Sequence, residues 1–166
     1  MFPVAEEHES ALKAWVASLP ASHMVYPPEM HNRAKYLFWK AYTPYHPLVR
    51  DAVLRFPFVH REGRQDYLLG TIAPGQSMRE FISYCVERGY GNHFVAWHDE
   101  GQVVSLRYVE DFVYQYHLRV FEDGEVRGHY EYTPECYPLS HLLDVGMEDR
   151  RDVFYQHLGD RVRPLR

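Results

Sequence analysis

Apolar residues recur at helical spacing through the first third of the chain. Residues 5–19 place apolar side chains three and four positions apart and stop at Pro20, which cannot continue a helix. The same spacing predicts a second helix over residues 27–42 and a third over residues 47–56. Residues 1–56 are therefore predicted to form a helical part of the protein.

The remainder of the chain changes to the alternation of apolar and polar residues that is typical of strands. Residues 58–73 predict a hairpin. A helix is then predicted from Ser77, which fits a capping box with Glu80, to Gly89, which suits the left-handed position after a helix. Four strands and a last helix follow, over residues 93–99, 102–109, 112–121, 125–132 and 148–158.

The connections between these strands decide the fold class. Short hairpin turns join antiparallel strands, because a parallel pair needs a long crossover connection. The order of elements predicts an α+β fold with an antiparallel sheet of about six strands, one hairpin plus a four-stranded meander. The N-terminal, central and C-terminal helices are expected to pack mainly on one face of this sheet. The 166 residues are expected to form a single domain, 1–166, with the sheet in residues 57–166.

Asp123 and Gly124, between two alternating segments, form the strongest hairpin signal in the chain. A two-residue turn at this pair fixes the register of the flanking strands and places His117 opposite Tyr130. In that register His117 and His129 are expected on opposite faces of the sheet. This argues against a site in which both histidines bind the same metal ion.

His129 and Glu131 share one face of the predicted strand, about 7 Å apart. His141 can join them if the segment after the strand folds back over the sheet. This set is the candidate ligand set for a divalent metal, and no other cofactor is indicated. The alternative interpretation is that these side chains are half-buried polar residues among tyrosines and form no site.

Four residues are candidates for binding a small ligand. His93 and Tyr108 are expected at the end of an apolar face, at the mouth of a pocket between the sheet and the helices. His117 and Tyr130 are expected opposite each other on the neighbouring hairpin. Histidine and tyrosine supply both ring stacking and hydrogen bonds to a bound molecule.

The second predicted helix is unusually aromatic. Tyr36, Trp39 and Tyr42 lie off its apolar stripe and are expected to remain on the surface. Exposed aromatic residues with lysines between them suit a protein–protein interface. The alternative is that neighbouring elements bury them.

Charge and cysteine content argue against several classes of protein. Residues 99–149 contain twelve acidic residues and three arginines, and such an excess repels phosphate backbones, so a nucleic-acid partner is not expected. The apolar runs are too short to span a membrane, and the first ten residues lack the pattern of a signal peptide. Two cysteines suit a reducing compartment, so the cytoplasm is the expected location.

Three functions remain open at this point. The favoured one is a non-enzymatic interaction domain that binds a protein partner or itself, as a homo-oligomer. The second is a metal-dependent hydrolase or nuclease that uses His129, Glu131 and His141. The third is a small-ligand pocket between the sheet and the helices. The sequence does not decide whether the protein is an enzyme.

Overall fold

The computed structural model describes four long stretches of the chain and a few shorter pieces. These are residues 6–22, 67–93, 99–137 and 148–164, with residues 37–38, 41–42, 45, 48–49 and 52. The α-helices in the described stretches are α1 (Glu6–Ala17), α4 (Met78–Glu87) and α6 (Arg151–Leu158). None of the described helices has the length and apolar composition needed to cross a membrane.

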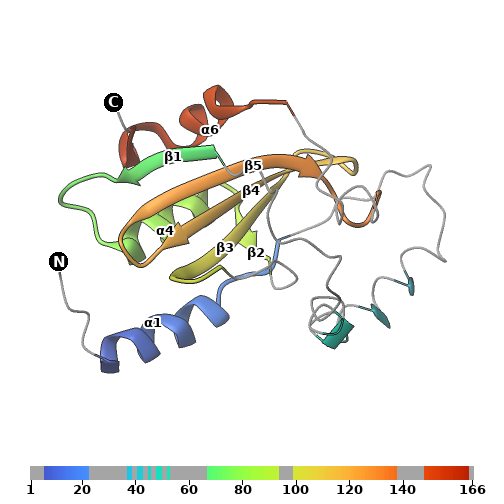
Figure 1. The fold of residues 1–166 in the computed structure, drawn as a ribbon, viewed down its shortest axis with the longest axis horizontal. Helices are drawn as coiled ribbons and strands as arrows, with labels where there is room; N and C mark the ends of the chain where they lie inside the picture. Colours follow the sequence, from blue (N-terminus) through green and yellow to red (C-terminus); the bar gives the residue numbers. More distant parts are fainter. Residues whose placement is uncertain are drawn as a thin grey trace.

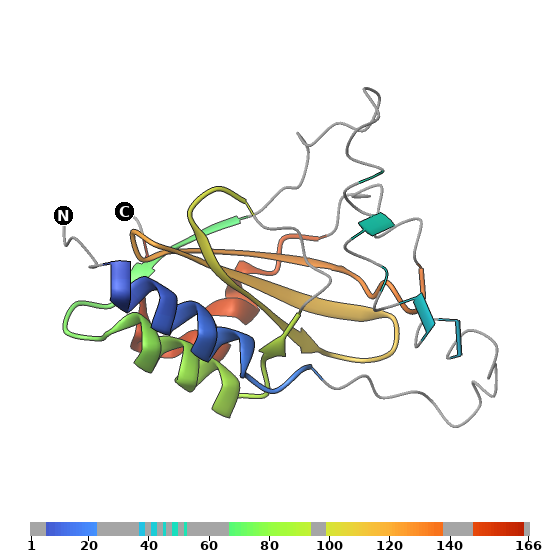
Figure 2. The ribbon, with the colours of Figure 1, turned by 90° about the horizontal axis from the view of Figure 1, so that it is seen from below.

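Six strands in the described stretches form one antiparallel sheet in the order β2-β3-β4-β5-β1-β6. Their bounds are β1 (Tyr67–Ile72), β2 (Gly91–Asn92), β3 (Gln102–Val109), β4 (Tyr114–Phe121), β5 (Glu125–Tyr132) and β6 (Val162–Arg163). The β3-β4-β5 meander forms the centre, and α1, α4 and α6 cover one face (Figures 1 and 2). The predicted α+β fold is confirmed, although the short strand β6 was not expected.

Helix α4 begins and ends where the sequence predicts. The Ser77 side chain accepts a hydrogen bond from the Glu80 amide, and the Glu80 carboxylate accepts one from the Ser77 amide, which completes the capping box. At the other end Gly89 has φ +95°. The Gly89 amide bonds to the Val86 carbonyl and the next amide bonds to the Cys85 carbonyl, as in a Schellman motif.

The hydrophobic core lies between the helices and one face of the meander. That face contributes even-numbered residues, because successive side chains of a strand alternate between faces. Its fully buried members are Val104, Leu106, Leu118, Val120 and Val126, and they pack in one cluster with Phe81 and Ile82 of α4 and Phe154 and Leu158 of α6.

The register of the β4–β5 hairpin differs from the predicted one. Tyr116 pairs with Tyr130 and His117 pairs with His129, one residue away from the expected pairing. The loop holds three residues instead of two, and Gly124 has φ +86° with its amide bonded to the Phe121 carbonyl. A type I turn followed by a left-handed glycine makes this kind of three-residue loop. The prediction that His117 and His129 lie on opposite faces was therefore wrong.

The register of the β2–β3 pair also differs from the predicted one. The His93 amide bonds to the Ser105 carbonyl, so His93 lies opposite Ser105 and not on the apolar face with Tyr108, where it was expected. Several predicted elements fall largely outside the described residues: the helices over 27–42 and 47–56, the first half of the hairpin over 58–73, and residues 94–98 of the strand before β3.

Candidate metal centre

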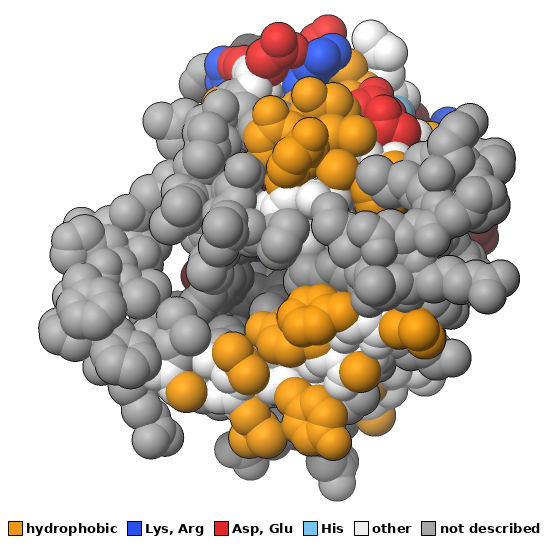
Figure 3. Space-filling view, turned by 90° about the vertical axis from the view of Figure 1, so that its right-hand side faces the viewer, with side chains coloured by type: hydrophobic (Ala, Val, Ile, Leu, Met, Phe, Trp, Pro, Cys, Tyr) orange, Lys and Arg blue, Asp and Glu red, His pale blue; other side chains and the backbone are white. Residues whose placement is uncertain are grey.

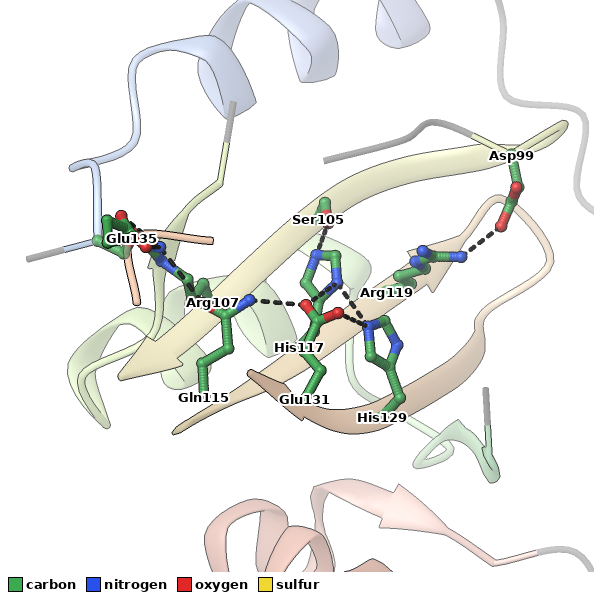
Figure 4. A network of polar contacts seen from close by, with 10 residues as sticks. Asp99, Ser105, Arg107, Gln115, His117, Arg119, His129, Glu131 and Glu135 are labelled. Atoms are coloured by element: carbon green, nitrogen blue, oxygen red, sulfur yellow. Dashed lines mark hydrogen bonds and ion pairs between the residues drawn. The ribbon is translucent and has the colours of Figure 1, made fainter. Parts of the chain in front are cut away.

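The face of the meander that α1, α4 and α6 do not cover is polar and almost entirely buried. It carries the odd-numbered residues of the same three strands, and each of those in the candidate centre is at most 6% exposed. These are Ser105 and Arg107 of β3, Gln115, His117 and Arg119 of β4, and His129 and Glu131 of β5 (Figure 4).

Three potential metal ligands meet at the centre of this face. The Nδ1 atom of His117 lies 3.2 Å from Nε2 of His129 and 3.6 Å from Oε1 of Glu131. The Nε2 atom of His129 lies 3.1 Å from Oε2 of Glu131. The cross-strand pairing of His117 with His129 brings the two rings together, and Glu131 follows on the same face of β5. We refer to His117, His129 and Glu131 as the His/Glu cluster.

The surroundings of His117 keep its imidazole neutral. The ring is fully buried, and the loss of solvation, together with the neighbouring His129, places its pKa well below the ordinary value of 6.5. Its Nε2 atom is in hydrogen-bond contact with the Ser105 hydroxyl, so a proton on Nε2 leaves the Nδ1 lone pair directed into the cluster. A neutral ring with one free lone pair is the form that binds a metal.

A chain of side chains fixes the Glu131 carboxylate. The Gln115 amide nitrogen donates to Oε1 of Glu131 at 2.6 Å. The Gln115 oxygen accepts from Nη1 of Arg107 at 3.2 Å, and Nη1 also donates to Glu135 at 2.9 Å. Arginine has only donors, so it forces Gln115 to turn its carbonyl oxygen toward Arg107 and its NH₂ group toward Glu131. Oε1 of Glu131 is therefore held as a hydrogen-bond acceptor.

The predicted metal set is only partly brought together. His129 and Glu131 lie in the cluster, whereas His141 is outside the described residues. Among the described residues the third ligand position is filled by His117, which the predicted register had placed on the other face. His117 lies on the same face as His129 because the loop has one residue more than predicted, and a shift of one residue moves every side chain of a strand to the other face.

The four predicted ligand-binding residues do not share a site. His93 and His117 lie on the polar face with their rings edge to face at a centroid distance of 5.3 Å. Tyr108 and Tyr130 lie on the opposite face, where Tyr108 packs against Tyr90 and the Tyr130 hydroxyl donates to Glu110 at 2.7 Å. Burial and this bond to Glu110 raise the pKa of Tyr130.

A surface pocket of about 590 Å³ lies elsewhere, around the start of α4, and none of those four residues lines it. Its walls include Gln76, Arg79 and Arg161.

The structure describes only one of the three residues predicted to form a protein–protein interface. Tyr36 and Trp39 are outside the described residues, and Tyr42 stacks on Phe38 with ring centroids 5.6 Å apart. Leu37 and Phe38 belong to the apolar stripe of the helix predicted over residues 27–42, and they are 60% and 59% exposed. Hydrophobic side chains also reach the surface at several places on the side shown in Figure 3.

Sequence reasoning missed the residues that support the cluster. Ser105, Arg107 and Gln115 match no ligand motif, and single polar residues within strands read as ordinary solvent-facing positions. The signal that identifies them is parity, because they and the three ligands all occupy odd positions of adjacent strands once the register is known.

Comparisons of this chain with protein-family models, with curated proteins and with solved structures find no match. The function is therefore inferred from the geometry of the His/Glu cluster.

Proposed function

We propose that the protein binds one divalent transition-metal ion through His117, His129 and Glu131. The observation that supports this proposal is the convergence of three buried donor atoms of suitable type, held on two adjacent strands. Two imidazoles and one carboxylate are a donor set used by Zn²⁺ and by non-haem Fe²⁺.

The distances between the donor atoms are compatible with a shared ion. Zinc–nitrogen and zinc–oxygen bonds are about 2.1 Å, so two ligands of one ion lie about 3.0–3.4 Å apart at tetrahedral or octahedral angles. The two imidazole nitrogens are 3.2 Å apart, Oε2 of Glu131 lies 3.1 Å from His129, and Oε1 of Glu131 lies 3.6 Å from His117. With one donor atom taken from each residue, the three atoms lie within 4.8 Å of one another. Closing the set around one ion requires the side chains to rotate.

The contacts around the ligands also resemble those of a metal site. Ligating histidines usually hold their second nitrogen in a hydrogen bond, and ligating carboxylates are themselves hydrogen-bonded. The Ser105 hydroxyl forms a hydrogen bond with Nε2 of His117, and the Gln115 amide donates one to Glu131. These partners orient the ligands before an ion arrives, which reduces the entropy lost on binding.

Three protein ligands leave at least one coordination position for water. A metal ion lowers the pKa of bound water to about 7 and so supplies hydroxide at neutral pH. We therefore place the protein among metal-dependent hydrolases, with Glu131 and the two histidines as metal ligands. The free, buried cysteines Cys85 and Cys136 are consistent with the expected cytoplasmic location.

Metal binding is tested by titrating EDTA-treated protein with Co²⁺, which reports nitrogen and oxygen coordination in its visible spectrum, and with Zn²⁺ in competition. We expect one ion per chain, and loss of binding in His129→Gln and Glu131→Gln. The matched control is His157→Gln, because His157 is a partly buried histidine that packs against Tyr90, on the helix side of the sheet. Absence of stoichiometric binding in the unmodified protein, by elemental analysis as well, would show that the cluster is a hydrogen-bond network only.

Hydrolysis is tested separately with chromogenic carboxylate and phosphate esters. We expect turnover that requires the metal and disappears in Glu131→Gln. Metal binding without turnover on any ester would leave metal binding intact and remove the hydrolase assignment.

Self-association remains a second candidate function, supported by the exposed apolar side chains of Leu37, Phe38, Tyr45, Leu48 and Val49. Light scattering after size exclusion tests it. A homo-oligomer that dissociates in Leu37→Asp/Phe38→Asp supports this function, and a monomer at all concentrations rejects it.

A further inference from the structure

Besides Arg107, a second buried arginine lies on the polar face next to the His/Glu cluster. Arg119 is two residues beyond His117 on β4, directly across from Ser105 on β3, and only 1% exposed. Because side chains two residues apart share a face of a strand, Arg119 and His117 are neighbours on the polar face of β4. Figure 4 shows it on the side of the cluster that leads to Asp99.

The two arginines beside the cluster are held in different ways. Arg107 is fixed by Ser22, Gln115 and Glu135, whose contacts come from three separate segments of the chain. Arg119 donates from Nη1 to Asp99 at 2.6 Å. The Asp99 side chain is 48% exposed and belongs to the turn before β3, whereas the Arg119 side chain is 2% exposed. A buried guanidinium is therefore paired with a half-exposed carboxylate.

With a metal ion bound, the net charge around the His/Glu cluster and Arg119 favours binding of an anion from outside the protein. Two neutral imidazoles, one carboxylate and a divalent ion sum to +1, and Arg119 raises the local charge to +2. Asp99 cancels one of these charges from the solvent side. Buried charges of one sign are costly unless they are paired, so an anion that reaches both cations is strongly favoured.

We propose that Arg119 and the metal together bind an oxyanion group of the substrate, a carboxylate or a phosphate, and that this group displaces the Asp99 carboxylate. One substrate oxygen occupies the open metal position, and another accepts hydrogen bonds from the guanidinium, whose planar fork suits such groups. Asp99 then acts as an internal competitor for the anion site. This inference rests on the proposed metal binding and names the substrate class of that site.

The test measures anion binding to the Zn²⁺-loaded protein by isothermal titration calorimetry, with inorganic phosphate and with acetate as separate probes. We expect Asp99→Asn, which removes the competitor, to bind the preferred anion about two- to fivefold more tightly. We expect Arg119→Gln to weaken it at least about tenfold. The tighter of the two probes identifies the group as phosphate or carboxylate.

Arg127→Gln is the matched control, because Arg127 lies on the same face opposite Arg119 but is paired with Glu125 and 42% exposed. This variant should bind the anion as the unmodified protein does. Zn²⁺ affinity is measured for every variant, so that loss of the metal is distinguished from loss of the anion site.

If the unmodified protein binds Zn²⁺ but its anion affinity is the same in Asp99→Asn, the inference is overturned and the proposed metal binding stands. If the unmodified protein binds no metal, both are overturned. Asp99→Asn changes an exposed side chain, so the inference remains testable even if Arg119→Gln does not fold.

Discussion

The two faces of the β3-β4-β5 meander are buried to the same degree and are chemically opposite. The face toward the helices is made of aliphatic and tyrosine side chains. The other face carries two arginines, two histidines, one glutamate, one amide and one hydroxyl: Arg107, Arg119, His117, His129, Glu131, Gln115 and Ser105. Burying apolar groups stabilises the fold, while burying polar groups costs free energy unless each finds a partner. The apolar face therefore stabilises the domain, and the polar face holds an arrangement that stability alone does not require.

The largest effect is expected from Leu118→Ala on the apolar face. Leu118 is fully buried in the core cluster, so its truncation removes transfer free energy and leaves a cavity. The free energy of unfolding should fall by about 2–5 kcal/mol, measured by urea denaturation of metal-free protein. The metal affinity of the folded variant should not change, because Leu118 points away from the cluster. A loss below about 1 kcal/mol would show that this face is not the main source of stability.

The second-largest effect is expected from metal binding, which stabilises the folded protein against unfolding. A ligand that binds only the folded state at one hundred times its dissociation constant adds about 2.7 kcal/mol to the free energy of unfolding. We expect this increment in the unmodified protein and in Leu118→Ala, and none in His129→Gln. An equal increment in His129→Gln would mean that the metal binds elsewhere.

The sequence predicts one of these faces better than the other. Apolar spacing is enough to identify the core residues of α4, because hydrophobic burial depends on position along an element and not on exact pairing. The polar cluster depends on which residues of β4 and β5 lie opposite each other. A glycine at position 124 suits both a two-residue and a three-residue loop, so the turn residues do not decide the register.

The pattern of hydrophobic residues in β4 and β5 indicates the correct register of the hairpin. A two-residue loop pairs Leu118 with His129 and Val120 with Arg127, so that apolar and polar residues share each face. The observed loop pairs Val120 with Val126 and His117 with His129, which separates the two kinds of residue. Choosing the register that separates them would have placed His117 in the cluster. The contacts of Ser105 and Gln115 with their neighbours depend on side-chain conformations that no sequence pattern specifies.

A pH dependence should separate the polar face from the apolar one in metal-free protein. Burial lowers the pKa of His117 below 6.5, so the unfolded chain binds more protons than the folded protein as the pH falls below about 6.5. Stability is therefore complete above this pH and declines below it, by at most about 1.4 kcal/mol per pH unit for one proton.

Urea denaturation of the metal-free protein between pH 8 and pH 5 measures this slope. His117→Gln should be less sensitive to pH than the unmodified protein. Part of the slope should persist in the variant, because burial also lowers the pKa of His157. A slope that is unchanged in His117→Gln would contradict a neutral, buried His117.

The smallest effect is expected at the loop that sets the register. Gly124 has φ +86°, and a Cβ atom at this position meets no atom within 4 Å, so Gly124→Ala adds backbone strain and no steric clash. The cost should be about 1 kcal/mol, and Gly124→Asn should recover part of it because asparagine tolerates this conformation. Gly101→Ala is the control, with φ +73° and the same open surroundings in the preceding turn. Metal affinity should stay the same in all three variants. A variant at position 124 that keeps its stability but loses the metal would show that the strands can slip by one residue and exchange the two faces.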